Sequence, residues 1–447
     1  MLKVDFSKTA GKIKPMNAVN NGPTRCKELN SPGNVEVYKN LEIPYARNHD
    51  ASFYSNYGGE YSVDVHRIFP DFDADENDIN SYLFTPTDNY IESTFMANTE
   101  TFYRLGARIE HRHKKGTFPP KNNLKWARIC EHIIRHYTEG WGDGFNYKIE
   151  YWEIWNEPDC RNWDGSNPCW QGTDEEFIKF YVETSRYLKE KFQHLKIGGP
   201  AMGWMESEMV RPFLKAIKDE GGELDFFSYH YYGGSPHTFK ETIDYASSLL
   251  SECGFPNVEK ILNEWNYSSS DSKCPYPAYA YEMERGIKGS SFAAAAMATG
   301  QANDVDMLMY YDARPCGMNG LFDTDNPKKV RDTYYSFLMF KDLRRLGTYV
   351  PTPWQPDTNI YSCAATNGTD SSIMFTHFNV DDTTFAKDVE IEVTNLKGSG
   401  KYRVQYFILN EEQKLSYMYE DVIEGDSFKK TLFMKIFTSC LVKITSM

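Results

Sequence analysis

The chain lacks several features that would place it in a common class. It has no run of about 20 apolar residues, the length needed to span a bilayer. It has no phosphate loop ending in Gly-Lys-Ser/Thr, no dinucleotide fingerprint and no Gly-x-Ser-x-Gly nucleophile elbow. Basic residues are fewer than acidic ones, 49 against 63, and the net charge of -14 disfavours nucleic acid as a partner. These absences argue against a membrane protein, a nucleotide-dependent enzyme and a nucleic-acid-binding protein.

The nine cysteines do not form a Cys-x-x-Cys pair. Their odd number implies at least one free thiol unless chains pair. Cys160 and Cys169 could bridge a loop, although reduced thiols are the simpler expectation. No signal peptide is visible, so a cytoplasmic location is expected for the chain as it stands, and a periplasmic or secreted one if a signal peptide has been removed.

The length of 447 residues favours one large domain with a smaller one beside it. Eight apolar segments look like strands, and segments of helical periodicity separate most of them. This alternation predicts an α/β fold, a (β/α)8 TIM barrel with a smaller C-terminal β-sandwich domain. The predicted strands are Lys14–Asn20, Leu41–Arg47, Ala107–His113, Ile149–Asn156, Leu195–Met202, Leu224–Tyr232, Lys260–Asn266 and Asp306–Arg314.

Three parts of the chain are expected to have different roles. Residues 13–345 are assigned to the catalytic barrel and residues 346–447 to the β-sandwich accessory domain, which contains a predicted strand Thr431–Ser446. Residues 1–12 are expected to add a strand to the sandwich. Residues 48–94, rich in Tyr, Asp and Asn, are expected to form an extended loop over the pocket.

The segments that carry chemistry are Trp152-Glu-Ile-Trp-Asn-Glu-Pro158 and Ile261-Leu-Asn-Glu-Trp-Asn266. Each looks like a strand that ends in an Asn-Glu pair. Glu157 falls just past the fourth predicted strand and Glu264 inside the end of the seventh. The length of chain between them fits three βα units of about 31 residues each. Both carboxylates are therefore predicted at the C-terminal rim of the barrel, where barrel active sites lie.

Two carboxyl groups that face each other across a pocket are what cleavage of a glycosidic bond requires. The group that acts as an acid needs a raised pKa, and Trp152, Trp155 and Trp265 are expected to supply apolar walls for it. Asn156 is expected to donate to a sugar hydroxyl. Glu153 lies within its strand rather than at the exit, so we expect a structural role for it. A single Asn-Glu-Pro occurs by chance, and the prediction depends on two such sites at barrel spacing.

Ile154-Trp-Asn-Glu-Pro158, with the later Asn-Glu-Trp-Asn, resembles glycoside hydrolase family 39, which belongs to clan A and includes β-xylosidases and α-L-iduronidases. The resemblance implies a retaining mechanism without a cofactor, with Glu157 as acid/base and Glu264 as nucleophile. It further implies a glycone pocket lined by His49, Asn156, His230, Tyr232 and Tyr311. Other segments that carry the resemblance are Lys14-Pro-Met-Asn-Ala-Val-Asn-Asn-Gly-Pro23, Arg47-Asn-His49, Phe177–Leu195 leading into Lys196-Ile-Gly-Gly-Pro200, Phe227-Ser-Tyr-His-Tyr-Tyr232 and Tyr310-Tyr311.

Two segments depart from the xylosidases of that family. The chain reads Glu110-His-Arg-His-Lys-Lys115 after the third predicted strand and Asp312-Ala-Arg-Pro315 after the eighth. His113 and Arg314 are therefore further candidates for substrate binding. Such cations could bind an acidic sugar, or they could pair with Asp and Glu of the long loop, which we favour. The sequence leaves the glycone, its anomeric configuration and the oligomeric state open.

The predicted function is an exo-acting retaining glycoside hydrolase with a carbohydrate substrate. One alternative is a non-catalytic carbohydrate-binding protein on the same scaffold. Another is a metal hydrolase that uses His132 and His136, which lie four residues apart on a predicted helix. A zinc protease helix carries Glu directly after the first His, whereas this chain has Ile133, so we expect no metal site.

Overall fold

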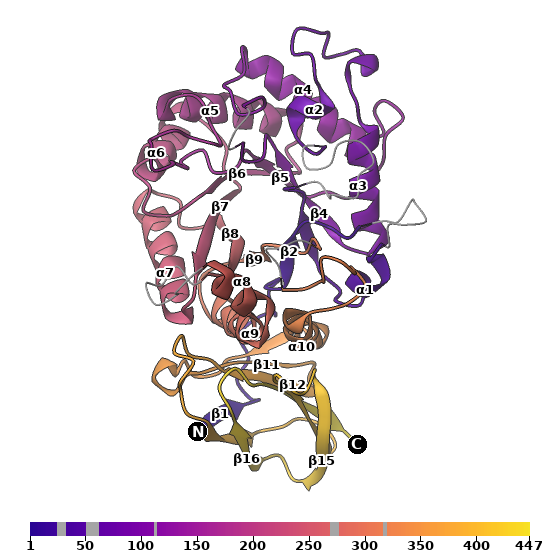
Figure 1. Cartoon of the computed structure of the whole chain (residues 1–447), viewed down its shortest axis with the longest axis vertical. Helices are drawn as coiled ribbons and strands as arrows, with labels where there is room; N and C mark the ends of the chain where they lie inside the picture. The colour runs from indigo at the N-terminus through magenta and orange to yellow at the C-terminus, as the bar shows by residue number, and fades with distance from the viewer. Residues whose placement is uncertain (25–32, 51–61, 111–113, 269–276, 316–319) are drawn as a thin grey trace.

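The computed structural model describes residues 1–447 except 25–32, 51–61, 111–113, 269–276 and 316–319. Eight parallel strands close into a barrel, and two further sheets form a β-sandwich beside it (Figure 1), which confirms the predicted fold class. The barrel strands are β2 (Ala18–Asn20), β3 (Tyr45–Arg47), β4 (Glu100–Leu105), β5 (Tyr151–Ile154), β6 (Lys196–Met202), β7 (Phe226–Gly233), β8 (Glu259–Tyr267) and β9 (Met307–Tyr310).

Helices surround the barrel and also separate it from the sandwich. In Figure 1 α3 to α7 lie around the outside of the barrel, while α9 and α10 lie between the barrel and the sandwich. No helix in the described part of the chain is both long and apolar enough to cross a membrane. The helices are α1 (Val35–Lys39), α2 (Val65–Ile68), η2 (Ile79–Ser81), α3 (Thr85–Met96), α4 (Asn123–Thr138), α5 (Asp174–Lys191), α6 (Val210–Glu220), α7 (Pro236–Glu252), α8 (Pro277–Arg285), α9 (Ile287–Ala302), α10 (Asp332–Leu346) and η3 (Pro356–Thr358).

The interior of the barrel changes from apolar to polar along the strands. Its floor is a buried cluster of Ala18, Phe102, Tyr151, Phe226, Ile261, Met307 and Met309. Side chains two residues apart on a strand point to the same side, so the next layer contains residues such as Arg104, Glu153, Ser228 and Asn263. All four are fully buried. The apolar floor therefore supports a polar layer directly beneath the C-terminal rim.

Two predictions about the N-terminal half were wrong. The third barrel strand is Glu100–Leu105, not Ala107–His113, and its Arg104 is buried because it pairs with Asp64 at 2.7 Å. The segment 48–94 is not an extended loop, since its described part contains α2, η2 and α3. The other seven predicted barrel strands overlap observed ones.

The β-sandwich consists of a three-stranded sheet, in the order β1-β13-β16, and a six-stranded sheet, in the order β10-β11-β12-β17-β14-β15. Side chains from both sheets share one buried core. The predicted strand Thr431–Ser446 is two strands, separated by a turn at Phe437, whose φ is 61°. The strands are β1 (Leu2–Asp5), β10 (Thr348–Val350), β11 (Ile360–Thr366), β12 (Ser371–His377), β13 (Lys387–Thr394), β14 (Lys401–Leu409), β15 (Ser416–Glu424), β16 (Phe428–Met434) and β17 (Ser439–Ser446).

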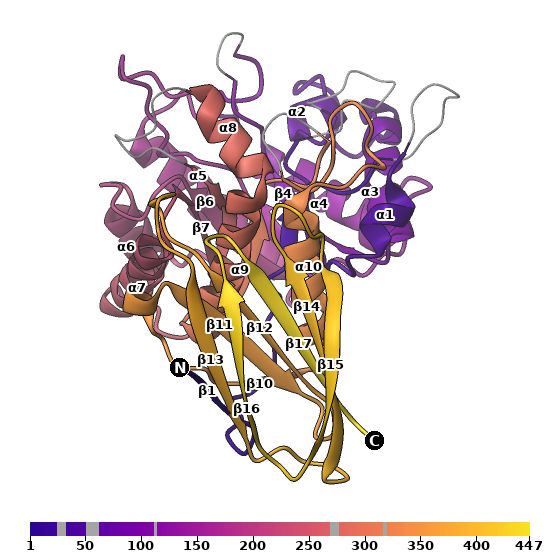
Figure 2. The same cartoon turned by 60° about the horizontal axis from the view of Figure 1, so that its bottom comes forward.

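The N-terminal strand β1 pairs in parallel with β13, so the first residues of the chain lie in the sandwich. Figures 1 and 2 show the N-terminus at the sandwich, beside a strand that is distant from it in the sequence. The exact division into domains after residues 12 and 345 stays a prediction.

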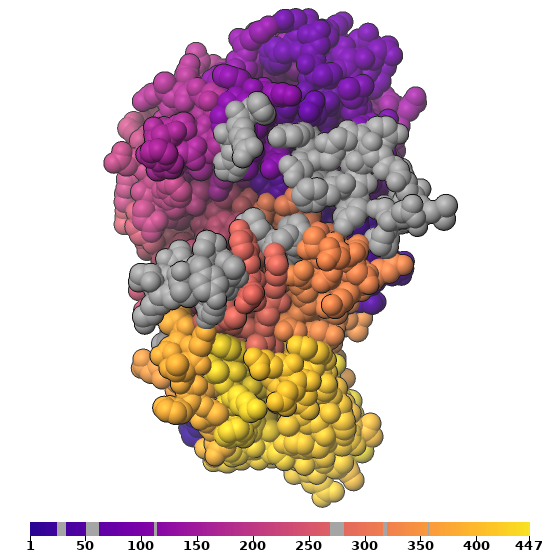
Figure 3. Space-filling model, viewed as in Figure 1, coloured from indigo at the N-terminus to yellow at the C-terminus, as the bar shows by residue number. Residues whose placement is uncertain are grey.

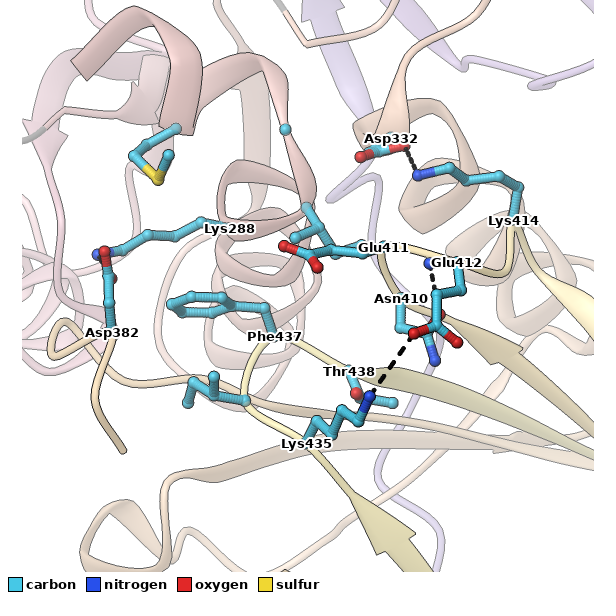
Figure 4. Close-up of a pocket in the computed structure, with 14 residues that line it drawn as sticks. Lys288, Asp332, Asp382, Asn410, Glu411, Glu412, Lys414, Lys435, Phe437 and Thr438 are labelled. Carbon is cyan, nitrogen blue, oxygen red and sulfur yellow. Dashed lines mark hydrogen bonds and ion pairs between the residues drawn. The ribbon is translucent and has the colours of Figure 1, made fainter. Parts of the chain in front are cut away.

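The barrel and the sandwich meet across α9 and α10, which contact β11 and β12. Figure 2 shows these helices against the six-stranded sheet. Figure 3 shows the barrel and the sandwich, the two lobes of the molecule, in continuous contact. A cavity of about 540 Å³ lies at this junction (Figure 4). Two ion pairs beside it join the lobes, Lys288 with Asp382 and Asp332 with Lys414.

The ring of Phe292 on α9 packs at the junction between the barrel and the sandwich, and its contribution to stability can be tested. It is fully buried and contacts the barrel rings of Phe239 and Trp265 and the sandwich ring of Phe378. Phe292→Ala should lower the free energy of unfolding by about 3–5 kcal/mol, because it leaves a cavity between the two lobes. Urea unfolding measures this change. Phe385→Ala is the matched control, since Phe385 is 90% exposed and its removal should change stability by less than about 0.5 kcal/mol. Equal losses in both variants would contradict the role given to Phe292.

Candidate active site at the C-terminal rim of the barrel

Glu157 lies where the chain turns sharply after β5. Trp155 and Glu157 have φ values of 79° and 45°, in the left-handed region that residues with side chains seldom adopt. The Glu157 backbone N–H donates to the carbonyl of Ala201 on β6 at 2.9 Å. This bond fixes the position of Glu157 relative to the neighbouring strand.

Glu264 reaches the pocket because β8 contains a bulge. Tyr229 aligns with Leu262, but the next residue, His230, aligns with Glu264, so Asn263 is the extra residue. The consecutive side chains of Asn263 and Glu264 therefore both point inward. Asn263 donates to Glu153 at 2.6 Å, deeper in the barrel, while Glu264 remains at the rim.

Glu157, His230 and Glu264 surround one small space. A carboxylate oxygen of each glutamate and a ring nitrogen of His230 all lie within 4.8 Å of one another. His230 Nδ1 is 2.9 Å from Glu157 Oε1, and its Nε2 is 3.6 Å from Glu264 Oε1. The structure thus brings together the two carboxylates that the sequence predicted at one rim.

A buried arginine, Arg47, binds Glu264 and two residues of the segment that carries Glu157. Arg47 Nε donates to Glu153 at 2.6 Å, Nη1 to Glu264 at 2.7 Å, and Nη2 to the Asn156 side-chain oxygen at 2.7 Å. Burial would lower the pKa of Arg47, but the carboxylates of Glu153 and Glu264 outweigh it and raise the pKa. The guanidinium is therefore permanently charged. Glu153 also accepts from Ser228 at 2.6 Å, which agrees with the structural role expected for it.

Burial and charge act in opposite directions on Glu264. Burial raises the pKa of Glu264, while the charge of Arg47 lowers it, and the pKa remains above its ordinary value. The Tyr232 hydroxyl donates to Glu264 Oε2 at 2.8 Å, which favours the ionised form. Burial lowers the pKa of His230, so this ring is neutral near pH 7.

The predicted glycone residues lie around these carboxylates. The ring of His49 meets that of Tyr311 edge to face at 6.0 Å, and Tyr232 meets Tyr311 at 6.3 Å. Asn156 Nδ2 and His49 Nδ1 are buried and have no hydrogen-bond partner among the described residues. These two nitrogens therefore have hydrogen-bonding capacity that the described residues do not use.

Arg314 is already paired with acidic residues. Its Nη2 lies 3.0 Å from Asp50 Oδ2 and its Nε lies 2.8 Å from Asp312 Oδ2. Asp50 also accepts from the Tyr311 hydroxyl at 2.5 Å. Of the two alternatives for this cation, the structure shows pairing with Asp. The other predicted cationic candidate, His113, lies outside the described residues.

The tryptophans beside the carboxylates do not face the pocket. Trp155 packs against Trp126 of α4 and Phe180 of α5, and Trp265 packs against Phe239 and Phe292. Trp152 is likewise fully buried and stacks on Tyr103. The expectation that these three rings form apolar walls around the catalytic acid was wrong. The rings alternate along the chain with side chains that point into the barrel, so they point toward the helices instead.

Two thiols lie beside Glu157 instead. Cys160 and Cys169 are free, and their sulfurs and a Glu157 oxygen all lie within 4.8 Å of one another. Cys169 Sγ is 3.7 Å from Glu157 Oε2. A hydrogen bond with Cys160, together with burial, raises the pKa of the Cys169 thiol well above its ordinary range. Cys169 is therefore protonated and can donate to Glu157, a contact that sequence reasoning missed although it had singled out both cysteines.

Two groups of residues in the described part of the chain have the types and distances to hold a metal ion. They are Glu157 with His230 and Glu264, and Glu157 with Cys160 and Cys169. The adjacent Arg47 charge disfavours a cation in the first group.

His132 and His136 belong to neither metal-capable group. His132 contacts the Arg128 carbonyl at 3.0 Å, and His136 contacts the Trp141 carbonyl at 2.8 Å and Asp88 at 3.1 Å. These contacts engage both histidines within the helix layer, and nothing in them supports a zinc site.

The family model for "Glycosyl hydrolases family 39" matches residues 13–296, which include both glutamates. The chain belongs to this family. It is 27% identical over 221 residues to a "Beta-xylosidase" from Geobacillus stearothermophilus, an alignment that covers 42% of each chain. It is also 27% identical over 147 residues to a "Beta-xylosidase" from Caldicellulosiruptor saccharolyticus, covering 32% of this chain and 27% of that one. The alignments thus span less than half the length of these curated relatives.

Solved structures share the whole fold of this family 39 chain. A glucosidase from Croceicoccus marinus matches with a TM-score of 0.80 at 19% identity, covering 100% of this chain and 99% of that one. A family 39 enzyme from Xanthomonas axonopodis pv. citri matches with a TM-score of 0.73 at 14% identity, covering 100% and 97%. These likenesses concern the fold and do not identify a substrate.

The role of Glu153 in holding Arg47 can be tested through stability. Glu153→Ala should lower the free energy of unfolding by about 3–5 kcal/mol, because it removes one carboxylate from a buried guanidinium and three short hydrogen bonds. Denaturant unfolding measures this loss. Glu150→Ala is the matched control, since Glu150 pairs with Lys196 near the surface and should contribute less than about 1 kcal/mol. A small effect of Glu153→Ala would mean that Arg47 does not depend on it.

Proposed function

We propose that this chain is a retaining glycoside hydrolase that releases sugars from the non-reducing ends of β-xylosides or of related neutral glycosides. Glu264 is the nucleophile and Glu157 the acid/base. The observation that carries the proposal is that one carboxylate oxygen of Glu157 lies within 4.8 Å of one of Glu264. Retaining enzymes hold their carboxyl groups about 5–5.5 Å apart, whereas inverting enzymes need about 6.5–9.5 Å to admit a water molecule.

In this proposal the two glutamates act in sequence on the anomeric carbon. Glu264 attacks it and forms a glycosyl-enzyme, while Glu157 gives its proton to the leaving oxygen. Glu157 then removes a proton from the water that hydrolyses the intermediate. Arg47 and Tyr232 each donate to one oxygen of Glu264, which keeps the nucleophile ionised and oriented.

The charges around the pocket support a neutral glycone. Burial would raise the pKa of Asp50, but Arg314 and its other neighbours hold the pKa below its ordinary value. The charge of Arg314 is thus matched by Asp50 and Asp312. A sugar carboxylate would have to compete with these two groups, which supports xylose or a similar glycone.

Substitution of each carboxylate separates their roles. Glu264→Gln should abolish turnover of all glycosides, because no glycosyl-enzyme can form. Glu157→Ala should slow substrates with poor leaving groups by about 10²–10⁴-fold, because they need a proton, while dinitrophenyl glycosides should form the intermediate at nearly the original rate. Steady-state and burst kinetics on both substrate types measure these effects.

Glu259→Gln is the matched control, since Glu259 begins the same strand at the opposite end of the barrel. It should retain full activity. Equal slowing of good and poor leaving groups by Glu157→Ala would reject the acid assignment. Failure of the unmodified chain to hydrolyse any glycoside, or to be labelled at Glu264 by a fluoro-sugar, would instead favour a carbohydrate-binding protein.

The pH profile provides a further test of the nucleophile. Glu264 must be ionised to attack, and its raised pKa places the acidic limb of kcat/KM above the ordinary glutamate value of about 4.3. Tyr232→Phe removes a donor to the ionised form, so the limb should move to higher pH by about half to one pH unit. Tyr231→Phe is the control, because this hydroxyl contacts the Ser235 carbonyl instead. A limb that stays in place or moves to lower pH would contradict the assignment.

A further inference from the structure

We infer that Trp204, together with Gly203, forms the binding site for the leaving-group sugar. This inference rests on the proposed function and identifies the part of the chain that recognises the aglycone side of the substrate. The chemical class of the ligand is a neutral pyranose ring whose C–H groups can pack on an indole face.

The direction of the leaving group follows from the acid. A group that protonates the glycosidic oxygen must lie within about 2.6–3.2 Å of it, so the departing sugar lies on the Glu157 side of the pocket. The loop after β6 borders this side. A Cβ atom added to Gly203 would lie 3.7 Å from Glu157 Oε1 and 3.5 Å from Asp159 Oδ1. The missing side chain therefore leaves room directly beside the proposed acid.

The loop that carries Gly203 is held firmly. The Gly203 backbone N–H donates to Asp159 Oδ1 at 2.9 Å, and Asp159 is buried. Met205 and Met209, which follow in the sequence, are also buried. The loop is therefore anchored at Gly203 and again after Trp204. This attachment joins the loops after β5 and β6 next to Glu157.

Trp204 differs from its anchored neighbours because it is 44% exposed. It immediately follows the glycine that leaves room beside the acid. The proposal requires that a sugar whose bridging oxygen reaches Glu157 extends over Gly203 to this indole.

The test compares two substrates that share a glycone but differ in the leaving group. Xylobiose carries a sugar as its leaving group, whereas β-D-xylosyl fluoride carries a single atom that does not reach the indole. Trp204→Ala should lower kcat/KM for xylobiose by roughly three- to tenfold and leave kcat/KM for the fluoride unchanged. Trp204→Phe should recover most of the loss.

Gly203→Ala tests the room beside the acid independently. Gly203 does not have a positive φ, and the added Cβ meets its neighbours at ordinary contact distances, so the fold should be retained. The variant should slow xylobiose more than the fluoride. Trp163→Ala is the matched control, because this indole is 99% exposed on the neighbouring loop and should not discriminate between the substrates.

The outcomes distinguish the two proposals. If Trp204→Ala affects both substrates equally, or neither, then Trp204 does not bind the leaving group and the inference is overturned while the proposed function stands. If the unmodified chain turns over neither xylobiose nor the fluoride, the proposed β-xyloside substrate fails, and the inference fails with it.

Discussion

The buried guanidinium of Arg47 is the constraint on which the candidate site depends. It binds Glu153 inside the barrel, Glu264 at the end of β8, and Asn156 beside Glu157. Because the guanidinium is planar and rigid, these three contacts fix the two strand ends relative to each other. A single cation thus binds Glu264 directly and the side chain of Asn156, the residue before Glu157, so it holds the two strand ends that carry the proposed catalytic carboxylates.

The cost of burying this cation explains the layers of the barrel. A charge in the interior requires a partner, and Glu153 supplies one at a depth where barrels usually carry branched apolar side chains. Glu153 in turn needs donors, which Ser228 and Asn263 provide. The bulge at Asn263 also turns the next residue, Glu264, inward. The polar layer and the geometry at the rim are therefore parts of one arrangement.

The sequence was sufficient for the fold but not for this arrangement. Apolar periodicity located seven barrel strands, yet it missed β4 because Arg104 is buried through an ion pair with Asp64 rather than through apolarity. It missed α3 because this helix buries hydroxyls, such as that of Ser93, which bonds to the Pro23 carbonyl at 2.9 Å. The two Asn-Glu pairs predicted both rim glutamates correctly by position. The bulge could not be foreseen, because it depends on the alignment of β8 with β7.

The environments of the two glutamates support their different proposed roles without reference to any relative. Glu264 contacts a permanent cation and a hydroxyl donor, which favour a carboxylate throughout the reaction. Glu157 contacts an imidazole that burial keeps neutral and approaches a thiol that remains protonated. Since an acid/base must lose and regain a proton in each cycle whereas a nucleophile must not gain one, this difference in surroundings supports the proposal that Glu264 attacks and Glu157 transfers the proton.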